Sequence, residues 1–164
     1  MKDMVLGYDD AASYEKGTSC FGATIGRNGN RIKDARFTID GKEWVIEANE
    51  NNNSLHSGKN GFNHLMWEMK ESGDNYVTFY HYSPQEEQGF PGNMHVTVTY
   101  TLDEEDTVHI TYHAKADADT VMNFTNHSYF NLAGHDSGVM LDQKLQLFAD
   151  AYSSSRATMR IPAR

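Results

Sequence analysis

Two runs of alternating apolar and polar residues near the middle of the chain constrain its fold more than any other feature. In both runs every second residue is apolar, and the residues between are mostly threonine or histidine. The apolar positions are Val96, Val98, Tyr100 and Leu102 in the first run, and Val108, Ile110, Tyr112 and Ala114 in the second. A period of two places successive side chains on opposite faces of a strand. Because the short acidic segment 103–106 separates the runs, they predict an antiparallel hairpin with one buried face.

Other segments also favour strands. The dipeptide Asp40-Gly41 suits a tight hairpin turn and predicts a second hairpin over Arg36–Glu47. Residues 76–82 predict another strand, and the proline- and glycine-rich segment 83–93 predicts an ordered loop. Helical signals are limited to one or two turns over residues 9–16. We therefore expect an all-β fold of antiparallel strands.

The length and charge of the chain limit the functions open to it. At 164 residues the chain suits one domain, residues 1–164, with a sizeable core. Charged residues make up 23% and apolar residues 38%, a composition unlike that of a disordered tail or a membrane protein. The formal net charge is -9, whereas binding to nucleic acid needs a basic surface. We expect no nucleic-acid or membrane partner, and a neutral or cationic small molecule as the ligand.

The cysteine content and the N-terminal residues bear on the compartment. Cys20 is the one cysteine, so no internal disulfide can form, as is usual in a reducing compartment. Residues 1–10 lack the apolar core of a signal peptide. We therefore expect a cytoplasmic protein, in which the glycosylation sequons at Asn52, Asn123 and Asn126 are coincidental.

The run from Asn126 to Gly134 is the strongest candidate for a functional site. His127 stands beside Asn126 and is followed by the aromatic pair Tyr129-Phe130. Polar hydrogen-bonding groups beside apolar bulk suggest a lined cavity, and histidine exchanges a proton near neutral pH. A histidine held in a polar network at the end of a strand explains the run about equally well.

Two earlier motifs supply further candidates. Asn30 and Arg31 offer a fork of donors suited to sugar hydroxyls or a ring oxygen. Taken alone, a loop arginine paired with a surface carboxylate is the simpler explanation. His56 lies among small residues that allow a ligand to approach, although a solvated loop histidine is again the simpler explanation.

The sequence carries no signal of a metal site or of a nucleophilic enzyme. On a strand, His109 and His113 would lie ~13 Å apart at about 3.3 Å per residue, too far to share one zinc ion. The Cys-x-x-Cys, His-Glu-x-x-His and Gly-x-Ser-x-Gly motifs do not occur. We therefore expect no metal.

Four motifs, in their order along the chain, resemble the aldose 1-epimerase (galactose mutarotase) family. They span nearly the whole sequence, which makes the resemblance far more specific than any one of them. The motifs are Phe21–Arg27 with Asn30-Arg31-Ile32, then Leu55-His56-Ser57-Gly58 with Gly61-Phe62 and Trp67-Glu68, then Gln88–Asn93, and finally Asn126–Leu132.

This resemblance implies an antiparallel β-sandwich of the large supersandwich type. It also implies an isomerase that interconverts the α and β anomers of a free aldose, such as galactose or glucose, without a metal or organic cofactor. By motif match, His127 would be the general acid that protonates the ring oxygen, and His56 would hydrogen-bond the sugar and polarise that oxygen. Asn30 and Arg31 would bind the substrate, and Tyr129 would lie near it.

The resemblance covers only the first half of the family's pattern. By this resemblance the chain begins inside the family's first strands and stops near its midpoint, so we expect a region incomplete at both ends. The family's catalytic base, a late glutamate, has no counterpart in these residues. Two alternatives therefore stay open, a non-catalytic carbohydrate-binding domain and an inactive fragment that self-associates or pairs with the missing half. A hexose-phosphate epimerase would require more basic residues than this acidic chain offers.

Overall fold

The computed structural model describes residues 2–151 and consists mainly of short and medium β-strands. The one α-helix among these residues is short and is capped by Asp10, whose side chain accepts a hydrogen bond from the Ser13 amide. The elements in order are α1 (Ala11–Lys16), β1 (Thr24–Ile25), β2 (Arg31–Ile32), η1 (Lys33–Ala35), β3 (Arg36–Ile39), β4 (Lys42–Val45), β5 (Ser54–Leu55), η2 (Phe62–His64), β6 (Glu68–Ser72), β7 (Tyr76–Ser83), η3 (Glu87–Gly89), β8 (Met94–Leu102), β9 (Val108–Ala116) and β10 (Thr125–Asn126).

The largest unit is a four-stranded sheet in the order β6-β7-β8-β9. The predicted hairpin is its centre, since β8 pairs antiparallel with β9 and Val98 lies opposite Tyr112. Val96 and Val98 are fully buried, while Thr97 between them points to the other face. The alternation therefore marks the buried face of β8 at Val96 and Val98, whereas Leu102 and Val108, on either side of the hairpin turn, are exposed.

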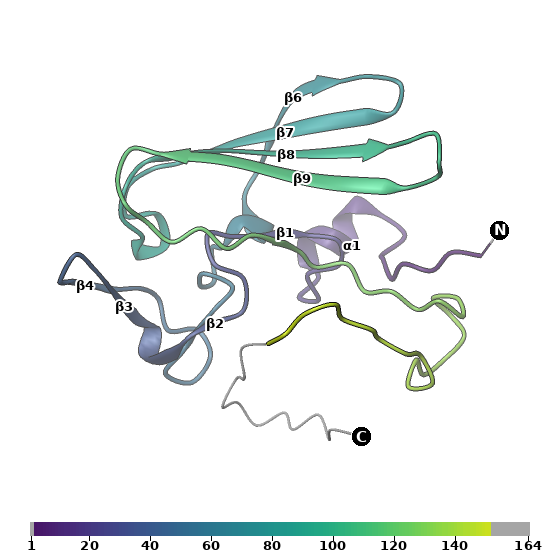
Figure 1. Cartoon of the computed structure of the whole chain (residues 1–164), viewed down its shortest axis with the longest axis horizontal. Helices are drawn as coiled ribbons and strands as arrows, with labels where there is room; N and C mark the ends of the chain where they lie inside the picture. Colours follow the sequence, from purple (N-terminus) through teal and green to yellow (C-terminus); the bar gives the residue numbers. More distant parts are fainter. Residues whose placement is uncertain (1, 152–164) are drawn as a thin grey trace.

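A second layer of short strand pairs lies against that buried face (Figure 1). Its antiparallel pairs are β1 with β10, β2 with β5, and β3 with β4. The last pair is the hairpin expected around Asp40-Gly41, and both turn residues have positive φ, 50° and 76°. All named strand pairs are antiparallel, so the predicted all-β antiparallel sandwich is confirmed.

Two apolar clusters hold the layers in place. One joins Phe62 to Met94 and Val96 of β8, and the other joins Ala35 and Ile46 to Phe90. Gly26 allows the first cluster to close, because a Cβ at this position would lie 2.4 Å from the Phe62 ring. The clusters therefore fix the segments that follow β1 and β5, which carry the candidate site residues.

Arg27 ties the loop between β7 and β8 to the second layer. Its side chain is fully buried, and its Nε donates to the Ser83 hydroxyl at 2.8 Å. Its other donors reach four backbone carbonyls of the loop, those of Ser83, Pro84, Pro91 and Gly92. A planar guanidinium suits this task because it presents several donors in a fixed fork. The segment predicted as an ordered loop is ordered by this arginine.

No helix among the described residues is long and apolar enough to cross a membrane.

Candidate functional site

A polar cavity of about 380 Å³ opens in the second layer, beside the ends of β5 and β10. Two of the sequence candidates, His56 and His127, line it together with Asn30. Its lining residues are Gly29, Asn30, His56, Asn123, Thr125, Asn126, His127 and Ser128. The rings of His56 and His127 meet edge to face with their centroids 5.1 Å apart. Residues distant in sequence thus converge on one site.

Strand pairing brings the two histidines together. His127 directly follows β10, whose residue Asn126 lies opposite Thr24 of β1, and the His127 amide donates to the Ala23 carbonyl at 2.9 Å. His56 directly follows β5, whose residue Leu55 lies opposite Arg31 of β2. Each histidine is therefore the first residue beyond a paired strand, where its side chain is free to face a cavity.

Asn30 and His56 hold each other through two hydrogen bonds. The backbone N–H of His56 donates to the backbone carbonyl of Asn30, and the backbone N–H of Asn30 donates to His56 Nδ1, both at 3.0 Å. Both residues have left-handed backbones, with φ of 64° and 54°. Such conformations occur mainly where the surroundings impose them, often at functional sites. Because Nδ1 accepts a hydrogen bond, the neutral imidazole of His56 carries its proton on Nε2.

The surroundings also favour the neutral form of His56. Burial lowers the pKa of His56, and the nearby His127 and Arg31 lower it further, while Glu50 opposes the change. At neutral pH, His56 is therefore an uncharged ring with an N–H donor.

The ring of His127 contacts two other rings. Besides its contact with His56, it lies tilted against Tyr129, with ring centroids 5.0 Å apart. Tyr129 also packs edge to face on Phe21. Among residues 2–151, none hydrogen-bonds the His127 ring, and His127 lines the cavity. Tyr129 supports this ring and does not itself line the cavity.

Arg31 does not itself line the cavity, but it bonds Asn30, which does, and it is already paired with a carboxylate. Glu50 accepts hydrogen bonds from its Nε and Nη2, each at 2.5 Å, and Asn30 Oδ1 accepts one from Nη1 at 3.3 Å. The carboxylate partner suggested by the simpler explanation therefore exists, but the pair lies beside the cavity and not on a remote surface.

Several lining residues were not singled out from the sequence. Asn126 and Ser128 belong to the predicted run, and the Asn126 side chain shapes the turn by accepting a hydrogen bond from the Ser128 amide. Asn123 and Thr125 lie just before this run, and Asn123 Nδ2 donates to the Gly29 carbonyl at 3.1 Å. The glycosylation sequons marked these positions, although only as coincidences.

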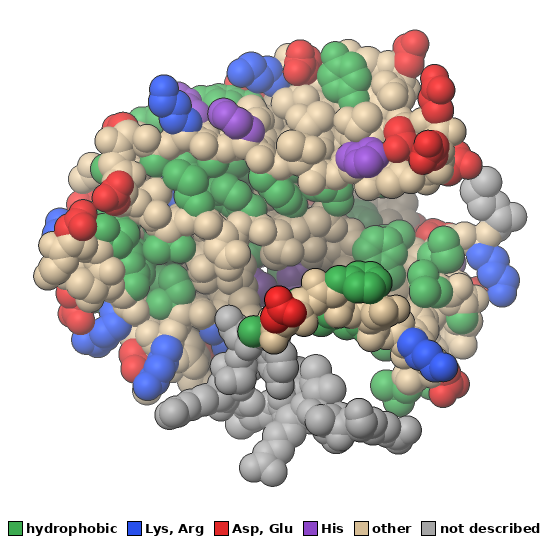
Figure 2. Space-filling model, viewed as in Figure 1, with side chains coloured by type: hydrophobic (Ala, Val, Ile, Leu, Met, Phe, Trp, Pro, Cys, Tyr) green, Lys and Arg blue, Asp and Glu red, His purple; other side chains and the backbone are tan. Residues whose placement is uncertain are grey.

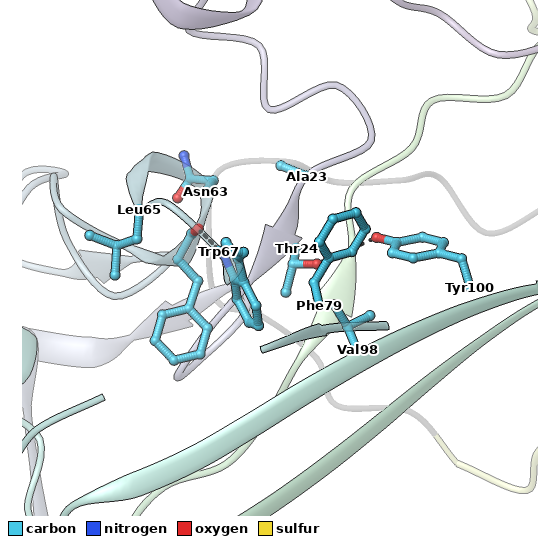
Figure 3. Close-up of a pocket in the computed structure, with 9 residues that line it drawn as sticks. Ala23, Thr24, Asn63, Leu65, Trp67, Phe79, Val98 and Tyr100 are labelled. Atoms are coloured by element: carbon cyan, nitrogen blue, oxygen red, sulfur yellow. Dashed lines mark hydrogen bonds between the residues drawn. The ribbon is translucent and has the colours of Figure 1, made fainter. Parts of the chain in front are cut away.

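A second cavity, of about 270 Å³, lies between β1 and the four-stranded sheet, and it is apolar. Figure 3 shows Trp67 and Phe79 facing this space, with Thr24 and Tyr100 beside them. The Trp67 indole N–H is already bonded to the Phe62 carbonyl at 3.1 Å. Since its lining lacks histidine and carboxylate, this cavity belongs to the packing between the layers, and Trp67 is a partly buried residue that packs against the core.

Within residues 2–151, no three His, Cys, Asp or Glu side chains cluster in a way that suits a metal ion. His109 and His113 lie on β9 with registers opposite Thr101 and Thr97, and His109 instead bonds Asp103 at 2.7 Å.

Comparison with known proteins places this site in a family context. A family model described as aldose 1-epimerase matches residues 1–163. Galactose mutarotase of Rattus norvegicus is 45% identical over 150 residues, which cover 92% of this chain and 43% of the rat protein. Aldose 1-epimerase of Escherichia coli (strain K12) is 38% identical over 152 residues, which cover 93% of this chain and 44% of that protein.

Solved structures of aldose epimerases also resemble this chain. The crystal structure of an aldose epimerase homologue from C. elegans superposes with a TM-score of 0.75 at 34% identity, covering 78% of this chain and 39% of that one. The crystal structure of galactose 1-epimerase from Lactobacillus acidophilus NCFM gives a TM-score of 0.73 at 25% identity, covering 80% of this chain and 40% of that one. The chain thus spans less than half the length of the relatives it matches.

Proposed function

Since this chain belongs to the aldose 1-epimerase family, we propose that its polar cavity binds a free aldose and serves to interconvert the α and β anomers of that sugar. The observation that carries the proposal is the meeting of His56, His127 and Asn30 in one open cavity. A volume of about 380 Å³ is in the range of small-molecule sites. The lining is rich in amides and hydroxyls, which suit the many hydroxyl groups of a sugar.

The proposed reaction opens and recloses the sugar ring. His127, as the general acid, donates a proton to the ring oxygen while the bond from that oxygen to the anomeric carbon breaks. A base takes the proton of the anomeric hydroxyl, which becomes the aldehyde oxygen. The aldehyde rotates, and the reverse steps close the ring on its other face and return both protons. Holding the acid and the sugar together in one cavity provides the required proximity.

The other residues bind and orient the sugar in this proposal. The Nε2–H of His56 donates to the sugar and polarises its ring oxygen, a role supported by the tautomer that the Asn30 amide selects. Asn30 and Arg31 bind hydroxyls of the sugar. Tyr129 stays behind His127 and holds its ring in place.

Galactose is the aldose we propose to test first, with glucose second. Several relatives are named galactose mutarotase, and two of them are 45% and 43% identical to this chain over 150 residues. We further propose a cytoplasmic location, supported by the single cysteine, Cys20.

The base is the part of this chemistry that the described residues do not supply. No carboxylate among residues 2–151 lines the cavity. Glu50 is paired with Arg31, Glu47 accepts from the Lys59 amide, and Glu87 is engaged by His81 and Ser83. We therefore propose that the base comes from polypeptide outside the described residues, and that the 164-residue chain alone is deficient in turnover.

Polarimetry tests this proposal. The rate at which fresh α-galactose approaches its equilibrium rotation is measured with and without the chain, and calorimetric titration measures binding of the same sugar. Binding with little acceleration beyond buffer is the expected result for the chain alone. Strong acceleration would refute the deficiency and would point to a carboxylate of this chain as the base. The absence of galactose and glucose binding would contradict the site itself.

A further inference from the structure

The ion pair between Arg31 and Glu50 is more organised than an ordinary surface contact. Both carboxylate oxygens of Glu50 accept hydrogen bonds from the arginine, one from Nε and one from Nη2, each at 2.5 Å. This two-point arrangement restricts the guanidinium to one plane and one direction. The hydrogen bond with Arg31 also lowers the pKa of Glu50, so the carboxylate is ionised at neutral pH.

The backbone around Glu50 is held as firmly as its side chain. Glu50 and Asn53 exchange two backbone hydrogen bonds, of 2.9 and 3.1 Å, which close a tight turn. The Asn53 side chain also accepts a hydrogen bond from the Asp34 amide. Asn49, just before this turn, bonds both the amide and the carbonyl of Leu55. Since Leu55 lies opposite Arg31 in the β2–β5 pair, Glu50 and Arg31 sit on one hydrogen-bonded frame.

This frame leaves a defined part of Arg31 available to a ligand. Glu50 takes the Nε proton and one proton of Nη2, and Asn30 takes one proton of Nη1. One N–H on each terminal nitrogen remains. Asn30, which accepts from Nη1, also bonds His56, so the guanidinium is linked through Asn30 to a histidine of the cavity.

Glu50 also balances charge at the site. Arg31 and His127 both disfavour a proton on His56, and Glu50 is the charged group that opposes them. With Glu50 in place, Arg31 offers hydrogen-bond donors without imposing an unbalanced positive charge on the histidines.

We propose that Glu50 is a positioning residue, which fixes the Arg31 guanidinium beside Asn30 and His56 so that one N–H of each terminal nitrogen is presented to a sugar oxygen. The claim that Arg31 donates to a sugar oxygen rests on the proposed function. The claims that Glu50 fixes Arg31 and affects the pKa of His56 do not rest on it, so each can fail without the other. A purely structural role is a poor explanation, because exposed ion pairs contribute little to stability.

Three variants of the full chain separate the effect of the Glu50 charge from the effect of its two-point contact with Arg31. Glu50→Gln removes the charge and one acceptor oxygen at nearly constant shape. Glu50→Asp keeps the charge but shortens the side chain, so the two-point contact is lost. Glu43→Gln is the matched control, because Glu43 pairs with Arg36 by one 3.6 Å contact on the β3–β4 hairpin, outside the cavity.

Nuclear magnetic resonance supplies two measurements that need no turnover. The first is the Arg31 Nε–H signal, which we expect to be protected from solvent exchange in the wild type and in Glu43→Gln, and lost in both Glu50 variants. The second is the pKa of His56, which we expect to fall in Glu50→Gln and to stay closer to the wild-type value in Glu50→Asp, because the charge remains.

The same samples are then titrated with galactose. We expect the dissociation constant to rise about two- to tenfold in both Glu50 variants, the cost of ordering one long side chain at the moment of binding.

These measurements test the positioning of Arg31 by Glu50 separately from the binding of sugar. A protected Arg31 signal that survives in Glu50→Gln, or a His56 pKa equal to that of the wild type, overturns the positioning role. Unchanged galactose affinity in a variant that has lost the protected signal also overturns it, because the held arginine would then not serve the ligand. If the wild-type chain binds no sugar, the proposed function fails, while the arginine signal and the His56 pKa still decide whether Glu50 positions Arg31.

Discussion

At the residue scale, the two histidines differ in their neighbours and therefore in the chemistry each can perform. His56 is tied through Nδ1 to the Asn30 amide and is biased towards its neutral form. His127 is held by ring contacts and leaves its nitrogens to the cavity. One ring is thus suited to donate a hydrogen bond and the other to transfer a proton, which is the division of roles that we propose.

Under the proposed mechanism, replacement of His127 by alanine in the full-length protein should reduce turnover by ~10²–10⁴-fold, the usual contribution of a general acid. Folding should persist, because the ring is only partly buried and no described residue hydrogen-bonds it. Polarimetry measures the rate, and circular dichroism checks the fold. His109→Ala, on the exposed edge of β9, is the control that should keep its rate. Near-normal turnover in His127→Ala would remove this residue from the mechanism.

The pH dependence of stability should carry a contribution from His56. Its pKa is lowered in the folded protein by burial and by His127 and Arg31, so between that pKa and about 6.5 the unfolded chain binds more protons. Stability from this group is therefore complete above about pH 6.5 and is lost as the pH falls through that value towards the folded pKa. Urea unfolding between pH 8 and pH 5 measures the effect.

The matched variant for this measurement is His56→Gln, which should show a flatter dependence over the same range. Asp103 and Asp117 also have lowered pKa values, because hydrogen bonds from His109 and Asn93 stabilise their ionised forms. Their contributions are lost only in more acidic solution, near the ordinary pKa of aspartate, and so do not interfere. Identical pH profiles for the two proteins would show that His56 is not perturbed.

At the scale of elements, the β3–β4 hairpin tests how far turn chemistry alone supports a strand pair. Gly41 has φ of 76° and no atom lies within 4 Å of an added Cβ, so a substitution there changes only backbone energy. Gly41→Ala should destabilise the protein by about 1 kcal/mol. Gly41→Asn should cost less, because asparagine tolerates this conformation better. Urea titration measures the free energy of unfolding. Equal values for the Gly41→Ala variant and the wild type would contradict the turn geometry.

The loop between β7 and β8 depends on Arg27. Arg27→Lys keeps the charge but cannot reach the Ser83 hydroxyl and four carbonyls at once, so several buried acceptors lose their donor. We expect a loss of about 3 kcal/mol or more in the free energy of unfolding. Arg36→Lys, an exposed position on β3, should change it by less than about 0.5 kcal/mol. Similar values for the two variants would mean that the loop is held by other contacts.

At the scale of the whole molecule, the described residues leave strand edges and apolar side chains uncovered. Strands β6 and β9 end the four-stranded sheet, each with one edge unpaired within residues 2–151. Every residue of β6 is exposed, and its charged side chains protect that edge from pairing. Towards the C-terminal end of the described chain, large apolar side chains are exposed, and Figure 2 shows hydrophobic groups at the surface of this side of the molecule. They are Val139, Met140, Leu141, Leu145, Leu147 and Phe148.

We therefore predict that the isolated chain self-associates or pairs with a complementary polypeptide. Sedimentation velocity should show species larger than a monomer that grow with concentration, because exposed apolar area and open strand edges favour association. Leu145→Lys should shift the distribution towards monomer. Gln146→Lys adds the same charge at a neighbouring exposed polar position and should do so much less. A monomer at all concentrations would contradict the prediction.

Local pattern was enough to predict much of the secondary structure. The alternation around Val96 and Val108 predicted β8 and β9, and Asp40-Gly41 predicted the β3–β4 turn. Such features depend on side-chain period and on turn residues that are neighbours in the chain. His127 and His56 were singled out as candidates because they stand in motifs of contiguous residues, and their roles came from the resemblance of those motifs to a family.

The cavity itself could not be read from any local pattern. It forms because Thr24 pairs with Asn126 and Arg31 pairs with Leu55, contacts between residues far apart in sequence. Pairings of this kind depend on closure of long loops and on the packing of layers, which no short window of sequence encodes. For the same reason, the sequence identified Arg31 as a sugar ligand or a surface ion-pair partner, and only the folded chain paired it with Glu50.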